Sequence, residues 1–145
     1  MDSSEVDSVL REMKFMQRLP EGLRGNVAVI LQEVSELRSV PEGAAWVREG
    51  EQTQNKGYIL VKGAVAIQKT GAPEHLESAP ELLGEIMQFN PVQLRTATVV
   101  ATEDCVVMRF FWDDFWAKIK DSLSEGDEET VKAAIESFAW EHFNR

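Results

Sequence analysis

The chain has 145 residues, of which 43% are hydrophobic and 28% charged, and its formal net charge is −10. This composition predicts one globular domain, residues 1–145, and its acidity opposes binding to nucleic acid or to an anionic membrane surface, which require clustered Lys and Arg. A single cysteine, Cys105, and an N-terminus without a signal-peptide pattern predict a cytoplasmic protein, and no apolar stretch approaches the roughly 20 residues of a membrane span.

Residues 1–35 are predicted to be helical. Ser3 and Ser4 can cap a first amphipathic helix that ends near Pro20. Its apolar positions are Val6, Val9, Leu10 and Met13. Asn26 can cap a second helix. The apolar stripe of that helix consists of Val27, Ile30, Leu31 and Val34.

The character of the sequence changes over residues 36–110. Short runs rich in β-branched and aromatic residues, among them YILV, AVAIQ, TATVV and CVVMRFF, alternate with Gly, Pro, Asn and Asp, which is typical of a compact all-β unit. Residues 111–145 return to a helical pattern that begins near Asp113, and Asp127 is a candidate N-cap for the last helix. The predicted fold class is therefore α+β, a β unit between N-terminal and C-terminal helices.

Several kinds of active site are disfavoured by the residue types that the chain contains. His75 and His142 are the only histidines, which is too few for a clustered-histidine metal site. Cys105 lies in the strand-like run CVVM, where a buried structural thiol is expected more than a nucleophile. The acidic run EGDEET lacks the ligand spacing of a calcium loop. We therefore expect neither a metal site nor catalysis.

The stretch LGEIMQFNPVQLRTAT combines residues that suit a small anionic ligand. Arg95 offers a planar fork to phosphate oxygens, Glu85 offers an acceptor to a sugar hydroxyl, and Gly84 allows close approach of the backbone. From spacing alone, an exposed ion pair between Arg95 and Glu85 is at least as good an interpretation.

The order of these motifs resembles the cyclic nucleotide-binding domains of the bacterial catabolite activator protein, the cAMP- and cGMP-dependent kinases and the cyclic-nucleotide-gated channels. The resemblance runs from about Leu10 to Lys120. VPEGAAWVREGE is similar to the family's entry into its β-roll and YILVKGAVAI to the next strand and glycine turn, whereas GEI and RTATVVATEDCVV resemble the phosphate-binding cassette and the strand after it. The resemblance implies a β-roll, a jelly-roll-like double-stranded β-helix, flanked by helices.

The resemblance also implies roles for individual residues. Gly84, Glu85 and Ile86 would belong to the ligand-binding cassette, with Gly84 and Glu85 at the ribose 2'-hydroxyl, and Arg95 would pair with the cyclic phosphate. The ten-residue step from Glu85 to Arg95 is that of the bacterial activators, which favours cAMP, with cGMP second.

Three further residues are implied to contact the ligand. Thr96 and Ala97 would add hydroxyl and backbone contacts to the phosphate, and a threonine at this position permits either cAMP or cGMP. Ile67 falls where the family places an apolar wall against the base, although ordinary core packing explains it equally well. The chain departs from the family pattern at Gly57, at Pro80 and Glu81, at Leu83 and at Met87.

These observations favour a cyclic nucleotide sensor module that is read by a protein partner. The alternative is a degenerate member of the family that acts as an interaction scaffold without nucleotide. An enzyme acting on a small phosphorylated substrate comes third, because the cassette contains no general base or metal set.

The last helix is predicted to dock on the β-roll and to move when ligand binds. Its apolar stripe consists of Val131, Ala134, Ile135, Phe138 and Ala139. Trp140 and Phe143 lie off this stripe and would cap the base, or else pack on the first helix or on a second subunit of a homodimer. Residues 121–145 carry a net charge of −5, so we expect few contacts and easy detachment.

Overall fold

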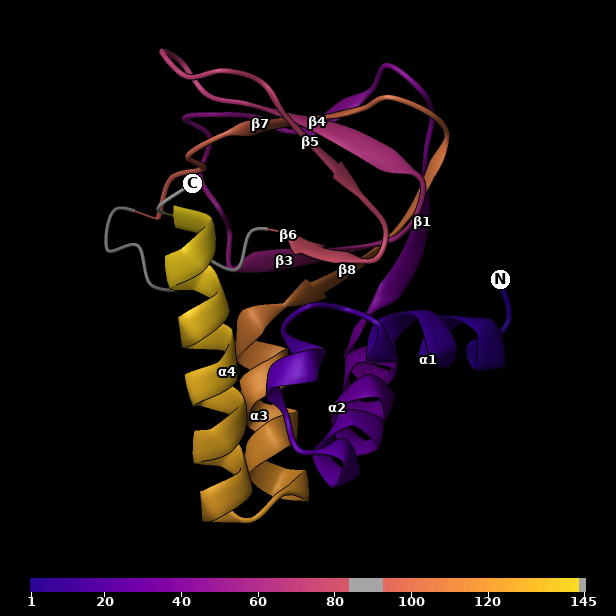
Figure 1. Ribbon diagram of the computed structural model, residues 1–145, viewed down its shortest axis with the longest axis vertical. Helices are drawn as coiled ribbons and strands as arrows, with labels where there is room; N and C mark the ends of the chain where they lie inside the picture. The colour runs from indigo at the N-terminus through magenta and orange to yellow at the C-terminus, as the bar shows by residue number, and fades with distance from the viewer. Residues whose placement is uncertain (84–92, 144–145) are drawn as a thin grey trace.

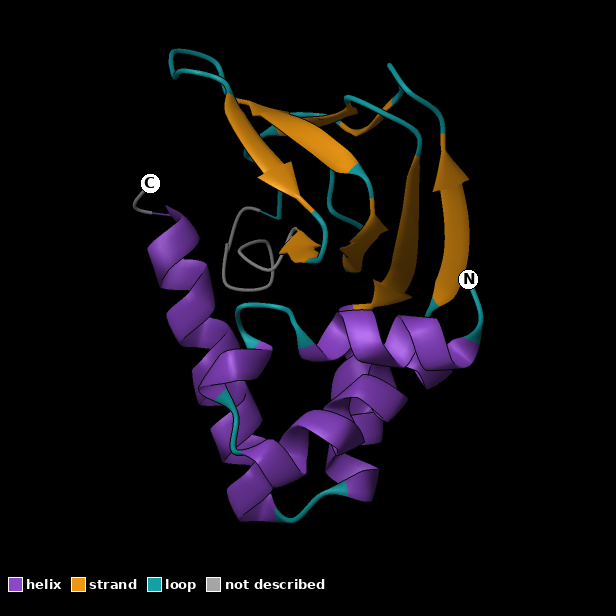
Figure 2. Ribbon diagram, turned by 45° about the vertical axis from the view of Figure 1, so that its right-hand side comes forward, coloured by secondary structure: helices purple, strands orange, loops and turns teal. Residues whose placement is uncertain are grey.

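The structure, a computed structural model, describes residues 1–83 and 93–143. The strands form two facing sheets, and the helices gather beneath one of them (Figures 1 and 2). The helices are α1 (Ser3–Arg11), η1 (Met16–Arg18, a 3₁₀ turn), α2 (Glu21–Val34), α3 (Trp112–Ser122) and α4 (Glu125–Phe143). The strands are β1 (Glu36–Val40), β2 (Ala45–Val47), β3 (Lys56–Lys62), β4 (Ala64–Gln68), β5 (His75–Ser78), β6 (Glu81–Leu83), β7 (Thr98–Ala101) and β8 (Cys105–Phe111). The predicted α+β fold is confirmed.

Both sheets are antiparallel, with the strand orders β1-β8-β3-β6 and β2-β7-β4-β5 in the described residues. Gly63 turns the chain from β3 in the first sheet into β4 in the second, and its φ of +104° is a conformation that glycine adopts without strain. A Cβ at this position would also lie 2.6 Å from the sulfur of Cys105. The predicted glycine turn is therefore a sheet-to-sheet crossing. No described helix is long and apolar enough to span a membrane.

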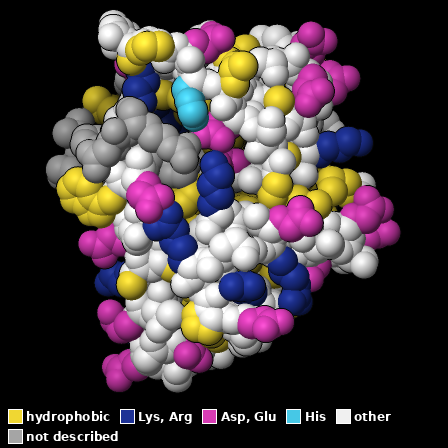
Figure 3. All heavy atoms as spheres, viewed as in Figure 1, with side chains coloured by type: hydrophobic (Ala, Val, Ile, Leu, Met, Phe, Trp, Pro, Cys, Tyr) yellow, Lys and Arg dark blue, Asp and Glu magenta, His cyan; other side chains and the backbone are white. Residues whose placement is uncertain are grey.

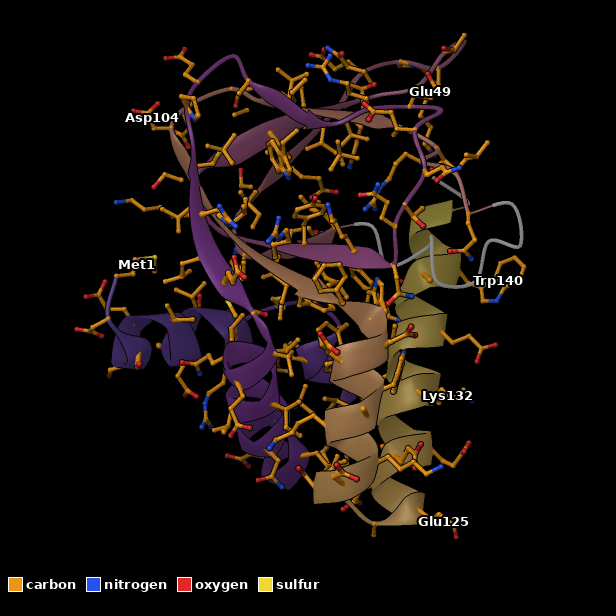
Figure 4. The ribbon with its side chains drawn as sticks, turned by 180° about the vertical axis from the view of Figure 1, so that it is seen from behind. Met1, Glu49, Asp104, Glu125, Lys132 and Trp140 are labelled. Atoms are coloured by element: carbon orange, nitrogen blue, oxygen red, sulfur yellow. The ribbon has the colours of Figure 1, made fainter. Side chains whose placement is uncertain are left out.

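The first sheet separates two apolar cores. Successive side chains of a strand point to opposite faces, so Ile59 and Val61 on β3 join the core beneath the sheet, which we call the helical core. Leu60 and Tyr58 face the other way, toward the second sheet. Leu60 belongs there to the inner core, and Tyr58 packs against it. The inner core consists of Val40, Val47, Leu60, Val65, Leu83, Val99, Ala101, Cys105 and Val107. Figure 4 shows side chains of both sheets filling the space between them.

The N-terminal helices have other boundaries than predicted. Asp2 caps α1, rather than the serines that follow it, and α1 ends at Arg11, well before Pro20. The second helix begins directly after Pro20 and not at Asn26. Proline has no N–H to lose and a fixed φ, so it favours a helix start, and this local preference outweighs the capping potential of an asparagine.

The C-terminal helices also begin slightly earlier than predicted. α3 begins at Trp112, one residue before Asp113. The backbone N–H of Asp127 donates to Oγ of Ser124 at 3.2 Å, so Ser124 caps α4 and Asp127 lies inside its first turn. The acidic first turn was predicted correctly, and only the capping residue was wrong.

Gly57, one of the departures from the family pattern, has a packing role. A Cβ at this position would lie 2.5 Å from the ring of Phe110 on the neighbouring strand β8. That ring is buried and makes an edge-on contact with Trp112, at 4.8 Å between centroids, and a tilted contact with Phe115 at 6.0 Å. The missing side chain thus leaves room for an aromatic cluster that joins β8 to α3.

The predicted apolar stripe of α4 is buried, but its described contacts are with α3 and the N-terminal segment, so docking of α4 on the β-roll stays a prediction. The five residues of the stripe are all buried, and four of them, Val131, Ala134, Ile135 and Phe138, belong to the helical core. Phe138 packs against Phe15, with 6.4 Å between ring centroids.

Arg18 of η1 fixes the second half of this helix. Its Nη1 donates to Oγ of Ser137 at 2.7 Å, its Nη2 pairs with Glu141, and its guanidinium lies 5.8 Å from the ring centre of Phe138. The expectation of few contacts is therefore wrong, because an arginine from the N-terminal segment neutralises part of the acidic helix and holds it.

The Gly57 contact can be tested by adding a single methyl group. We expect Gly57→Ala to lower the free energy of unfolding by about 1 to 3 kcal/mol, because Phe110 must move or the strands must separate. The control is Gly22→Ala on α2, where a new Cβ has no atom within 4 Å, so stability should be unchanged or higher. Thermal unfolding measures both changes. Equal midpoints for the two variants would contradict the packing role of Gly57.

Candidate functional site

Arg95 lies just before β7, and its backbone is fixed at a corner of the roll. Its N–H donates to the carbonyl of Glu51 at 2.8 Å, and its carbonyl accepts from the N–H of Gly50 at 2.9 Å. Only 7% of the residue is exposed. The side chain is therefore held inside the protein by a backbone that cannot easily move.

The hydrogen bonds of the Arg95 guanidinium are incomplete. Nη2 donates to the carbonyls of Thr53 at 3.2 Å and Lys56 at 3.0 Å. Nη1 is buried and has no hydrogen-bond partner in the described residues. A buried donor without a partner costs roughly 1 to 3 kcal/mol, and more on a charged group, so Nη1 is poised for an acceptor.

No carboxylate forms an ion pair with Arg95 within residues 1–83 and 93–143. Burial lowers the pKa of Arg95, while the neighbouring Tyr58 and Glu51 raise it. The guanidinium carbon lies 5.5 Å from the centre of the Tyr58 ring, whose face attracts a cation. An arginine stays protonated even when buried, so this site holds a positive charge for which the described part of the chain supplies no ion-pair partner.

The other predicted site residues are distributed unevenly around Arg95. Thr96 and Ala97 follow it directly and are partly exposed. Gly84, Glu85 and Ile86 lie outside the described residues, as does Met87, so their predicted roles stay predictions.

Ile67 and Trp140 lie on different parts of the fold. Ile67 is on β4, partly buried, and packs against the inner core, which suits either core packing or a base contact. Trp140 is 60% exposed on α4 and points outward from the helix (Figure 4). The described residues therefore do not show Trp140 closed over the roll, and its role as a lid stays a prediction.

Sequence reasoning missed two aromatic residues beside the arginine. Tyr58 of β3 lies under the Arg95 guanidinium, and Trp46 of β2 meets the Tyr58 ring edge-on, with 6.4 Å between ring centroids and an interplanar angle of 78°. The signal was present in the run YILVKG, because alternation along a strand places Tyr58 on the same face as Leu60.

A second polar cluster joins the N-terminal segment to the strands before the cassette. Glu81 is 1% exposed, and its Oε2 lies 3.5 Å from Nζ of Lys14. The neighbouring Glu77 lies 4.0 Å from the same Nζ and 2.6 Å from Nε2 of His75. Glu81 is one of the departures from the family pattern, and the structure gives it an ion-pair partner. The described residues contain no group of three or more His, Cys, Asp or Glu suited to a metal ion.

The comparisons with known proteins agree with this architecture. The family model of the cyclic nucleotide-binding domain matches residues 37–122, more than half of the chain. The chain belongs to this family. The resemblance inferred from the sequence motifs is thereby confirmed.

A relative and two solved structures illustrate the likeness. Pycsar effector protein BcPycTIR of Burkholderia cepacia is 29% identical over 119 residues, which cover 75% of this chain and 39% of that protein. This chain therefore spans less than half of the relative's length. The sensor domain of the transcriptional regulator DNR from Pseudomonas aeruginosa has a TM-score of 0.68 and 18% identity, covering 94% of this chain and 91% of that one. Thermus thermophilus catabolite activator protein has a TM-score of 0.67 and 22% identity, and the match covers 86% of this chain and 57% of that one.

The buried carboxylate Glu77 predicts a pH dependence of stability. Burial raises its pKa, but hydrogen bonds from His75 and Glu81 and the charge of Lys14 outweigh this and leave the pKa below the ordinary value of 4.5. A lowered pKa stabilises the fold above about pH 4.5, and this contribution is lost as the pH falls through the folded-state pKa.

We therefore expect Glu77→Gln to lower the unfolding midpoint at pH 7 by a few degrees and to weaken the loss of stability below pH 4.5. Glu74→Gln, an exposed change beside the same strand, is the control. Thermal unfolding at pH 7, 4 and 3 measures both. A Glu77→Gln penalty of the same size at all three pH values would contradict the assignment.

Proposed function

We propose that this protein is a non-catalytic regulatory module that binds a 3',5'-cyclic mononucleotide through Arg95. The observation that carries the proposal is the buried guanidinium with an unpartnered Nη1, in a chain that belongs to the cyclic nucleotide-binding domain family. A planar guanidinium with a free donor suits a phosphate oxygen in both charge and geometry. In a chain with a net charge of −10, a buried positive charge that no described carboxylate pairs with supports a functional role for Arg95.

The surroundings of Arg95 favour a nucleotide over free phosphate. Tyr58 and Trp46 provide aromatic surface on one side, and Ile67 adds an apolar contact on β4. These side chains suit a base and a sugar, whereas inorganic phosphate would use none of them. The spacing in the sequence supports cAMP as the first candidate, and Thr96 keeps cGMP as the second.

The alternative is a degenerate member of the family that serves as an interaction scaffold. A scaffold without ligand gains nothing from an uncompensated buried charge, which costs several kcal/mol to desolvate. Arg95 therefore supports the sensor more than the scaffold. On the described part of the face in Figure 3, Lys and Arg are interspersed with Asp and Glu.

The output of the module is proposed to pass through α4 to a protein partner. The relative from Burkholderia cepacia is named an effector protein, and this chain matches only 39% of it, which supports a sensor role for the matched part. Trp140 is a large exposed apolar residue near the end of α4 and a candidate contact for the partner or for a second copy of the chain.

Titration of the four common 3',5'-cyclic mononucleotides by calorimetry tests the ligand. We expect Arg95→Ala to weaken binding by about ten- to a hundredfold, because a charge-assisted hydrogen bond contributes roughly 1.5 to 3 kcal/mol. Arg38→Ala, which removes an exposed arginine of β1, is the matched control and should bind normally. Unchanged affinity in a folded Arg95→Ala protein would remove Arg95 from the site. Failure of all four nucleotides to bind would favour the scaffold.

The role of α4 can be tested by hydrogen exchange. We expect exchange across residues 133–141 to slow when nucleotide binds, and Arg18→Ala to speed it in the free protein, since Arg18 holds Ser137 and Glu141. Arg38→Ala again serves as the control. Identical exchange of α4 with and without bound nucleotide would place the response of the protein elsewhere.

A further inference from the structure

Trp46 has a donor that no described residue satisfies. Its indole Nε1 is buried and has no hydrogen-bond partner, although the side chain as a whole is partly exposed. The residue lies on β2, at a register shift between Ala45 and Val47 in the pairing with β7. Such an irregularity re-aims side chains, and here both Trp46 and Val47 pack at the inner core.

The position of Trp46 relative to Arg95 is specific. Both side chains contact the same ring, with Tyr58 lying 6.4 Å from the Trp46 ring and 5.5 Å from the Arg95 guanidinium carbon. Within the described residues, Trp46 Nε1 and Arg95 Nη1 are both buried donors without a partner, and both side chains contact one tyrosine. Tyr58 is thus a common neighbour of the two donor residues.

The other buried tryptophans provide a contrast. Trp112 and Trp116 also have a buried Nε1 without a partner, but both lie in or against the helical core. Their rings stack at 6.5 Å and contact Phe115 edge-on. The described ring contacts of these two residues are with each other, with Phe115 and, for Trp112, with Phe110. Of these three indoles, only Trp46 has a described ring contact with Tyr58, the residue that also contacts Arg95.

We propose that Trp46 is a ligand-binding residue whose indole N–H donates a hydrogen bond to an oxygen or ring nitrogen of the molecule held by Arg95. This inference rests on the proposed function, and it adds a neutral, directional contact to the charged one. A buried donor that gains its partner only from the ligand contributes to affinity and also rejects molecules without an acceptor at that point. Trp46 would thus help to select which cyclic nucleotide is bound.

Indole resonances allow a direct test on the whole protein. The four tryptophans give four indole N–H signals in a ¹H–¹⁵N correlation spectrum, and Trp46→Phe identifies one of them; if that variant does not fold, the Phe variants of the other three identify it by elimination. We expect the Trp46 proton to move downfield when the tightest-binding cyclic mononucleotide is added. The signals of Trp112 and Trp116 should move far less.

Calorimetry supplies the second readout. Trp46→Phe keeps an aromatic ring but removes the donor, so the dissociation constant should rise about threefold to tenfold. Trp116→Phe makes the same chemical change at the helical core and should leave the constant unchanged. The Trp46 assignment is overturned if the Trp46 signal does not move or if Trp46→Phe binds with unchanged affinity. If binding still depends on Arg95 in that case, the proposed function stands. If none of the four nucleotides binds, both are wrong.

Discussion

A guanidinium that is buried and has no carboxylate partner among residues 1–83 and 93–143 is the constraint on which the candidate site depends. Moving a charge out of water costs several kcal/mol even after relaxation, and the described residues return only two carbonyl contacts and the face of one aromatic ring. The backbone of Arg95 is fixed on both sides by Gly50 and Glu51, so the side chain cannot escape by moving the chain. The cost of burying the Arg95 guanidinium is therefore only partly offset by the described residues. A bound anion would offset it more fully than any described side chain does.

The first sheet has two faces with different roles, and this separation allows the protein to tolerate the buried Arg95 guanidinium. Stability comes mainly from the helical core, where β3 and β8 contribute one face and all four α-helices contribute apolar side chains. The inner core lies on the other face and carries the tyrosine and tryptophan beside Arg95. Gly57 and Tyr58 show how closely these roles are joined, because adjacent residues of one strand serve the helical core and the site. A protein built in this way can keep unsatisfied donors on one face while the other face holds it folded.

Much of the fold follows from local pattern, and the reasons are visible in single residues. The stripe from Val131 to Ala139 could be predicted because helical periodicity depends only on near neighbours. The family could be predicted because its turns and its cassette are local motifs. The clash that explains Gly57 could not, since it depends on Phe110, 53 positions away in the sequence. The ion pair between Glu81 and Lys14 could not be predicted either, because these residues come together only in the tertiary fold.

The sequence indicated Arg95 as a candidate anion contact, but it did not indicate what surrounds that residue. Arg95 followed from the motif RTAT, but its burial and its missing partner are properties of three-dimensional packing. Trp46 carried no usable signal, since a tryptophan in a short strand is most often core. Its proximity to Tyr58 arises from a register shift that sequence alternation cannot indicate.

The N-terminal segment contacts both the strands β5 and β6 and the C-terminal helix α4. Lys14 pairs with Glu77 and Glu81 on the strands that lead into the cassette, and Arg18, four residues later, pairs with Ser137 and Glu141 on α4. Between them Phe15 packs on Phe138. Within the described residues, the stretch 14–18 therefore contacts both the strands β5 and β6 and the helix α4, and it is the part of the chain through which these elements are joined.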